Sequence, residues 1–141
     1  MEATTLRPSW TFAQKGVLVL AALLTVWSVA GLIANPDFST GADAPTERIL
    51  GVDFNGWHAV SGFLLFAPAF VAILRPVWAL AYALAAGGAL VVTGIWVAAD
   101  TEPLFILHLP NNGFDAVFHI ASGLLFLAIA AVQLNRDRAT P

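Results

Sequence analysis

Four long apolar segments constrain the fold of this chain more than any other feature. None of them contains lysine, arginine or glutamate, and they cover residues 16–34, 55–74, 77–99 and 114–134. A helix needs about 17–25 residues to cross the hydrocarbon core of a bilayer. We therefore predict a four-helix transmembrane bundle whose outer loops lie at 35–54 and 100–113.

The composition supports a membrane environment. Hydrophobic residues make up 59% of the 141 residues and charged residues only 11%, whereas soluble domains carry roughly 25% charged residues. A water-soluble fold of this size could not bury so much apolar surface, so we expect one all-α domain over 1–141 with the lipid bilayer around it. The few basic residues exclude a nucleic-acid surface, and the absence of cysteine excludes disulfides and thiolate metal sites.

Local signals mark the ends of the predicted helices. Thr11 and Gln14 form a capping-box pattern before the first span, and Pro36 ends that span because proline disfavours helix in the residue before it. Pro68 has no amide hydrogen and should kink the second span. The link at 75–76 is so short that the second and third spans should pack as an antiparallel hairpin.

The first span has one feature of a signal peptide, since Arg7 and Lys15 precede it. Its apolar stretch is longer than the usual stretch of about 7–15 residues, however, and no small-residue cleavage site follows it. We therefore expect this segment to be retained as a true span.

Basic residues are distributed unevenly between the two ends of the predicted helices. One side carries Arg7, Lys15, Arg75, Arg136 and Arg138, while the other carries only Arg48 together with most of the acidic residues. Short loops that are rich in lysine and arginine stay in the cytoplasm. The sequence thus predicts a multi-pass protein of the bacterial plasma membrane with both termini cytoplasmic.

A short motif occurs twice, at the start of the second span and of the fourth. It consists of an aromatic residue, a histidine, two further residues, a serine and a glycine, with His58, Ser61 and Gly62 in one copy and His119, Ser122 and Gly123 in the other. Each copy opens the second helix of a predicted hairpin. This indicates two helical hairpins repeated in parallel about an axis along the membrane normal, with both histidines near the outer surface.

Two polar residues precede the histidines and suggest how the motifs are held. Asn55 stands three positions before His58, and Asp115 stands four positions before His119. Either side chain can cap the start of a helix, where the helix dipole favours the negative charge of Asp115. The carboxylate of Asp115 can also accept a hydrogen bond from the ring of His119.

The small residues of each motif suggest close approach to a neighbour. Gly62 and Gly123 remove side chains above the rings, which would let another helix or a flat ligand approach. Ser61 and Ser122 can bond to a carbonyl of the preceding turn or across a helix interface. All four are therefore candidate residues of a structural or ligand site.

Several roles are open to the histidine pair. Two neutral imidazoles can tie the outer loops to the bundle, ligate a haem iron between two helices, or hold a divalent metal ion. Proton-coupled transport is a further alternative, although membrane proton relays usually need a charged residue within a span, and none lies deep in these. A third histidine, His108, lies in an apolar segment that we expect at the outer surface.

No catalytic motif accompanies these residues, since the chain lacks G-x-S-x-G, H-E-x-x-H and a phosphate-binding glycine loop. We therefore expect a non-enzymatic protein with a structural or accessory role and no cofactor, haem-based electron transfer being the alternative. Small residues crowd the third span at Ala81, Ala85, Gly87 and Gly88, which is typical of tight helix packing in lipid. They favour a homo-oligomer or a subunit of a larger membrane complex.

The two motifs and the residues before them resemble those of an uncharacterised family of four-span membrane proteins, found mostly in actinobacteria and catalogued as domain of unknown function 4383. That family carries N-x-x-H-x-x-x-G after the first outer loop, which Asn55, His58 and Gly62 match, and D-N-x-x-H-x-x-x-G after the second, which Asp115 opens. Ala116 replaces the usual asparagine of the second motif. The resemblance covers roughly residues 17–132 and implies a small multi-pass membrane protein without an assigned activity.

Overall fold

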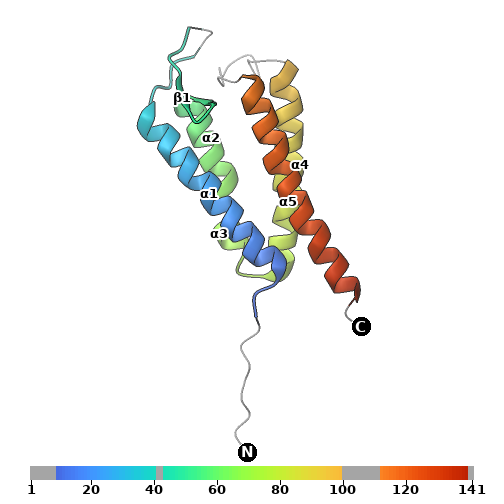
Figure 1. The fold of residues 1–141 in the computed structure, drawn as a ribbon. Helices are drawn as coiled ribbons and strands as arrows, with labels where there is room; N and C mark the ends of the chain where they lie inside the picture. Colours follow the sequence, from blue (N-terminus) through green and yellow to red (C-terminus); the bar gives the residue numbers. More distant parts are fainter. Residues whose placement is uncertain (1–8, 41–42, 100–111, 140–141) are drawn as a thin grey trace, which may run out of the picture.

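The computed structural model describes residues 9–40, 43–99 and 112–139 (Figure 1). The chain is mostly helical, as expected for an all-α membrane bundle. Its elements in chain order are α1 (Phe12–Ala34), β1 (Glu47–Ile49), β2 (Val52–Phe54), α2 (Gly56–Phe66), α3 (Ala69–Ala72), α4 (Pro76–Ala99) and α5 (Gly113–Ala139). The start of α1 and the end of α5 lie together at what we call the terminal end, and the strands lie at the opposite, hairpin end (Figure 1).

Among the described residues, three helices are long and apolar enough to cross a membrane, namely α1, α4 and α5. The span predicted at 55–74 corresponds to a shorter apolar segment, Gly56–Ala72, which is divided into α2 and α3. The predicted break at Pro68 explains the division, because a proline leaves the carbonyl of Leu64 without its helical hydrogen bond.

Two glutamines fasten the helices to one another at the terminal end. The capping box of Thr11 and Gln14 is present as predicted, and the side-chain amide of Gln14 also donates to the carbonyl of Ile73 at 2.7 Å. The amide of Ala13 at the start of α1 donates to Oε1 of Gln133 on α5 at 3.0 Å. We call the bonds from Gln14 to Ile73 and from Ala13 to Gln133 the terminal clasp. The first satisfies a carbonyl just after α3, and the second satisfies an amide that a helix start leaves without a partner.

The helices pair as two hairpins, α1 with α2 and α4 with α5 (Figure 1). Glycines permit both close approaches: a Cβ atom at Gly123 would lie 2.7 Å from the carbonyl oxygen of Gly87, and one at Gly62 would collide with the side chain of Ser28. The short link at Arg75 brings α3 against α4, whereas α2 itself packs mainly on α1 and β2. The predicted hairpin of the second and third spans is thus limited to the terminal end, and the tandem duplication stays a prediction.

The predicted outer loop at 35–54 contains a β-hairpin that the all-helical prediction missed. Strands β1 and β2 are antiparallel and place Ile49 opposite Val52, so only two residues form the turn. Leu50 and Gly51 both have positive φ angles, 48° and 96°, as a type I′ turn requires. Strands of three residues are too short for their alternation to be recognised in the sequence.

The β-hairpin packs its apolar side chains into the helices. Val52 and Phe54 are buried in a small core with Ala59, and Trp27 and Phe118 pack against this core from α1 and α5. A larger core fills the space between the helices towards the terminal end. The hairpin therefore closes one end of the bundle as part of its core.

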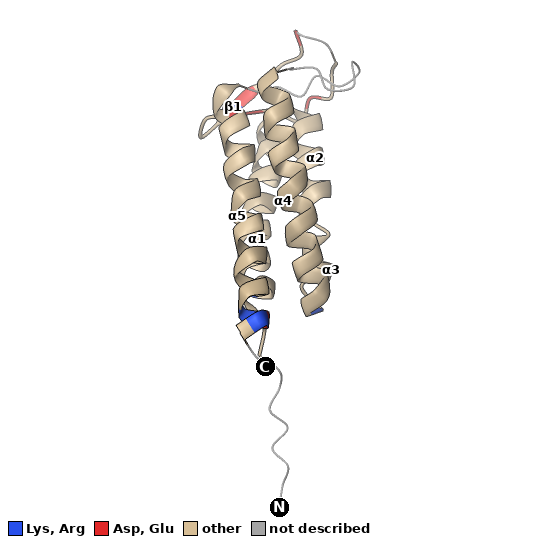
Figure 2. Cartoon of the chain, turned by 90° about the vertical axis from the view of Figure 1, so that its right-hand side faces the viewer, with Lys and Arg blue, Asp and Glu red and all other residues tan. Residues whose placement is uncertain are grey.

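Charged side chains separate along the long axis of the molecule (Figure 2). The basic residues in the described helices and in the link between α3 and α4 gather at the terminal end, namely Lys15, Arg75, Arg136 and Arg138. The described acidic residues lie at the hairpin end, except for Asp137. The long apolar helices between these two ends indicate a membrane-embedded protein.

Candidate functional site

The two motif histidines lie face to face near the hairpin end of the bundle. The ring centroids of His58 on α2 and His119 on α5 are 5.7 Å apart, and the ring planes differ by 29°. Phe54 of β2 also stacks with His58, with a centroid distance of 4.8 Å. The fold therefore brings together His58 and His119, which are far apart in the sequence and occupy equivalent positions in the repeated motif.

The position of His58 is fixed from two sides. Asn55 caps α2, as predicted, by accepting a hydrogen bond from the amide of His58 at 2.9 Å. The ring Nδ1 of His58 lies 2.6 Å from the carbonyl oxygen of Asp53. Because a carbonyl can only accept, Nδ1 carries a hydrogen.

Asp115 joins the β-hairpin to the start of α5 and makes no hydrogen bond to His119. Its side chain is fully buried, and Oδ2 accepts hydrogen bonds from the amides of Asn112 at 2.9 Å and Asp53 at 3.3 Å. Of the two predicted roles, the capping role is therefore the one present. Its Oδ1 has no hydrogen-bond partner within the described ranges.

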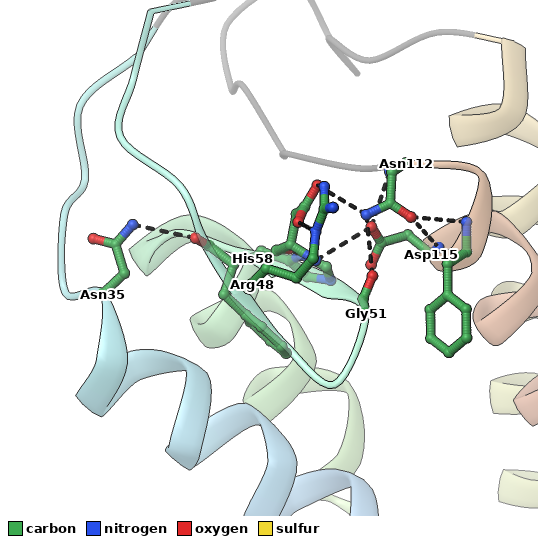
Figure 3. Close-up of polar contacts among 9 residues, drawn as sticks. Asn35, Arg48, Gly51, His58, Asn112 and Asp115 are labelled. Atoms are coloured by element: carbon green, nitrogen blue, oxygen red, sulfur yellow. Dashed lines mark hydrogen bonds and ion pairs between the residues drawn. The ribbon is translucent and has the colours of Figure 1, made fainter.

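Three residues that the sequence analysis did not single out complete this arrangement (Figure 3). Asn112 donates from its side-chain amide to the carbonyl of Gly51 at 3.1 Å and to Oδ2 of Asp53 at 2.8 Å. Arg48 forms a two-pronged pair with Asp53 at 2.5 and 2.9 Å. The side-chain hydrogen bond from Arg48 lowers the pKa of Asp53. We call Arg48, Asp53, Asn112 and Asp115 the hairpin network.

Asn112 could have been recognised from the sequence as a helix cap, because it stands directly before the first residue of α5. Its side-chain oxygen accepts from the amides of Phe114 at 2.7 Å and Asp115 at 3.2 Å, which is the usual work of an asparagine just before a helix. The pairing of Arg48 with Asp53 depends on the register of the β-hairpin and could not be recognised in the same way.

A cavity of about 200 Å³ lies beside the two histidines, between the hairpins of helices. Most of its lining is apolar, with side chains from α1, α2, β2, α4 and α5. The polar side chains that line it are Ser28, His58, Ser61, Thr93, His119 and Ser122. Four of the predicted site residues, together with Gly62, thus surround one space.

Of the two neighbours predicted for the motif glycines, a helix or a flat ligand, the structure has a helix at both positions. Gly62 is in contact with Ser28 of α1, and Gly123 with the backbone of α4. Helix packing explains both glycines, because a Cβ atom at either position would overlap the neighbouring helix.

The space beside the histidine rings is small. The space that the glycines were expected to provide is filled by helices, and a cavity of about 200 Å³ is smaller than the roughly 300–1,000 Å³ of pockets for drug-sized ligands. Within residues 9–40, 43–99 and 112–139, no group of three or more histidine, aspartate or glutamate side chains could hold a metal ion. His108 lies outside the described residues.

Comparison with known proteins places the chain in a family. The family model described as "Domain of unknown function (DUF4383)" matches residues 14–132, which include both histidine motifs and all the helices that border the cavity. Neither the search of curated proteins nor the search of solved structures gave a match. The chain therefore belongs to the DUF4383 family.

Proposed function

We propose that this chain is a non-enzymatic integral membrane protein with a structural or accessory role. The hairpin network carries this proposal. Asp115 accepts hydrogen bonds from the backbone amides of Asp53 and Asn112 and so joins the β-hairpin to α5, while Asn55 caps α2. They do not converge with the histidines on a point where a substrate atom could react, as a catalytic site requires.

We further propose that the protein lies in the bacterial plasma membrane with the terminal end in the cytoplasm. The basic residues at the start of α1 and α4 and at the end of α5 support this orientation. Since the chain has no cysteine, single cysteines can report it. Ser39→Cys should react with a membrane-impermeant thiol reagent in intact cells, and Ala139→Cys only after the membrane is opened. The reverse pattern would exclude this orientation.

Assembly into a homo-oligomer or a larger membrane complex is part of the accessory role. Ala81, Ala85 and Gly88 share one face of α4, where the alanines are exposed and nothing lies within 4 Å of the Cβ position of Gly88. Small residues on a lipid-exposed helix face permit close packing of another helix. This face is distinct from that of Gly87, which packs on α5.

Light scattering of the protein purified in detergent tests the assembly. We expect a mass larger than one chain or a co-purifying partner. Ala85→Trp should reduce the assembly, whereas Ala131→Trp, at an exposed position of α5, should leave it intact. If the native chain is monomeric and brings no partner with it, the accessory role has no support.

A further inference from the structure

The cavity beside the histidines contains polar groups whose hydrogen bonds are not made within the protein. In the described part of the chain, no hydrogen bond joins the ring nitrogens of His119 or the hydroxyl of Ser122 to another group. The ring N–H of Trp27, in the same lining, is buried without a partner among the described residues. By contrast, Ser28 in the same lining donates back to the carbonyl of Leu24 at 2.9 Å. Polar groups enclosed by apolar surroundings without a partner are costly. His119 and Ser122 therefore call for a partner that the protein does not supply.

The available groups define what such a partner must offer. Ser122 lies one helical turn after His119, so both side chains project from the same face of α5 into the cavity. A hydroxyl donates, and a neutral imidazole has one N–H to donate. Two neighbouring donors are matched by an acceptor oxygen, which a carbonyl group provides.

The walls of the cavity favour a flat ring. Trp27, Phe54 and Phe118 line it with the two histidines, and Trp27 and Phe118 stack on each other at 6.0 Å. A cavity of about 150 Å³ in another protein binds benzene, so about 200 Å³ is enough for one substituted six-membered ring. Aromatic walls stack on flat rings of this kind.

The approach to the cavity is from the side. The β-hairpin closes one end of the bundle and the terminal clasp closes the other. Helix α2, however, packs on α1 and β2 and not closely on α4 or α5. Ser61 of α2 lines the cavity and is also exposed. In a protein that crosses the bilayer, an opening between these helices faces lipid.

We propose that the cavity binds a quinone-type ring, the carbonyl-bearing head of a lipid-soluble molecule that enters from the bilayer. His119 and Ser122 donate to one ring carbonyl, the aromatic side chains hold the ring, and any apolar tail remains among the lipids. The inference goes beyond the accessory role and does not depend on it. Binding, not electron transfer, is what the site supports.

Two probes of matched shape test this proposal with the full chain in detergent. Tetramethyl-1,4-benzoquinone carries two carbonyl oxygens, and 1,2,4,5-tetramethylbenzene has the same ring and methyl groups without them. Because both probes dissolve in micelles, their concentrations are set relative to detergent. A ligand that binds only the folded protein raises the melting temperature with its concentration. We expect the quinone to raise it at lower concentrations than the hydrocarbon.

Conservative variants distinguish binding through hydrogen bonds to the ligand from binding through apolar contacts alone. His119→Phe keeps a ring of similar size, and Ser122→Ala is a milder change in case the first variant fails to fold. Each should weaken quinone binding by about two- to tenfold, the value of one neutral hydrogen bond, and leave the hydrocarbon unaffected. Trp78→Phe removes a ring N–H from an exposed side chain at the terminal end and should change neither.

The results that would overturn the proposal are equally defined. If neither probe changes the melting temperature of the native protein, the cavity is not a ligand site. If the two probes act alike and both variants bind them as the native chain does, the cavity is an apolar void and its polar groups are matched by water.

Discussion

Replacing Asp115 with alanine should loosen the β-hairpin from α5, because this one buried carboxylate holds two amides. Its Oδ2 accepts from Asn112 at 2.9 Å and from Asp53 at 3.3 Å, both at partly buried positions. A buried donor that loses its acceptor costs about 1–3 kcal/mol. The 3.3 Å bond is long, so its share lies at the lower limit of that range.

The net effect combines these losses with two smaller contributions. A carboxylate in the first turn of a helix adds about 0.3–1 kcal/mol through the helix dipole, but the variant no longer has to bury a charged group, which offsets part of the loss. We therefore expect the free energy of unfolding to fall by about 1–3 kcal/mol. Reversible unfolding in detergent, followed by circular dichroism, measures it.

Two further variants decide whether the reasoning is correct. Asp115→Asn keeps an oxygen that can accept both bonds and should recover most of the stability. Asp43→Ala removes a carboxylate from an exposed position of the same loop and should change the free energy of unfolding by less than about 0.5 kcal/mol. If alanine at 115 costs no more than alanine at 43, or if asparagine is no better than alanine, the hairpin network does not stabilise the protein.

Three other changes probe the remaining contacts. Arg48 holds the pKa of Asp53 below its ordinary value of 3.8, so this pair stabilises the fold above about pH 4, and that stability is lost as the pH falls through the lowered pKa. Between pH 7 and 2, the melting temperature of the native chain should therefore fall more steeply than that of Asp53→Asn. Parallel curves for the two proteins would show that the pair does not stabilise the fold. Gly123→Leu should prevent the close packing of α4 and α5 and lower the melting temperature sharply. Ala131→Leu, at an exposed position of α5, should not, and equal effects would refute the packing argument. Gln133→Ala should cost about 1–2 kcal/mol by leaving an amide at the start of α1 without its acceptor, measured by the same unfolding assay, and an unchanged stability would show that water replaces the bond.

The features that the sequence predicted well depend on residues close together in the chain. The apolar runs of α1, α4 and α5, the capping box at Thr11, the cap at Asn55 and the break at Pro68 all follow from interactions within about one helical turn. The repeat predicted that His58 and His119 lie near the same end of the bundle. It did not predict that their rings face each other, because that depends on how each helix is rotated about its axis.

The features that the sequence did not predict depend on contacts between segments that are far apart in the chain. Gly62 and Gly123 look alike in the two motifs, but which neighbour each one accommodates is decided by how the helices cross. The partners of Asp115 are the amides of Asn112 and of Asp53, and the second becomes a neighbour only after the β-hairpin has formed. Two strands of three residues are too short for an alternation of apolar and polar residues to be recognised in the sequence.

The position of the polar groups explains why the cavity persists. The terminal clasp and the hairpin network hold the two helix pairs together at their ends. The larger core packs the pairs against each other towards the terminal end, and the cavity lies beside His58 and His119. An apolar side chain at Ser122 would fill part of that space and gain buried area. The hydroxyl of Ser122 and the imidazole of His119 line this space instead, without protein partners. This part of the lining is therefore better suited to binding an oxygen-bearing ligand than to stabilising the chain.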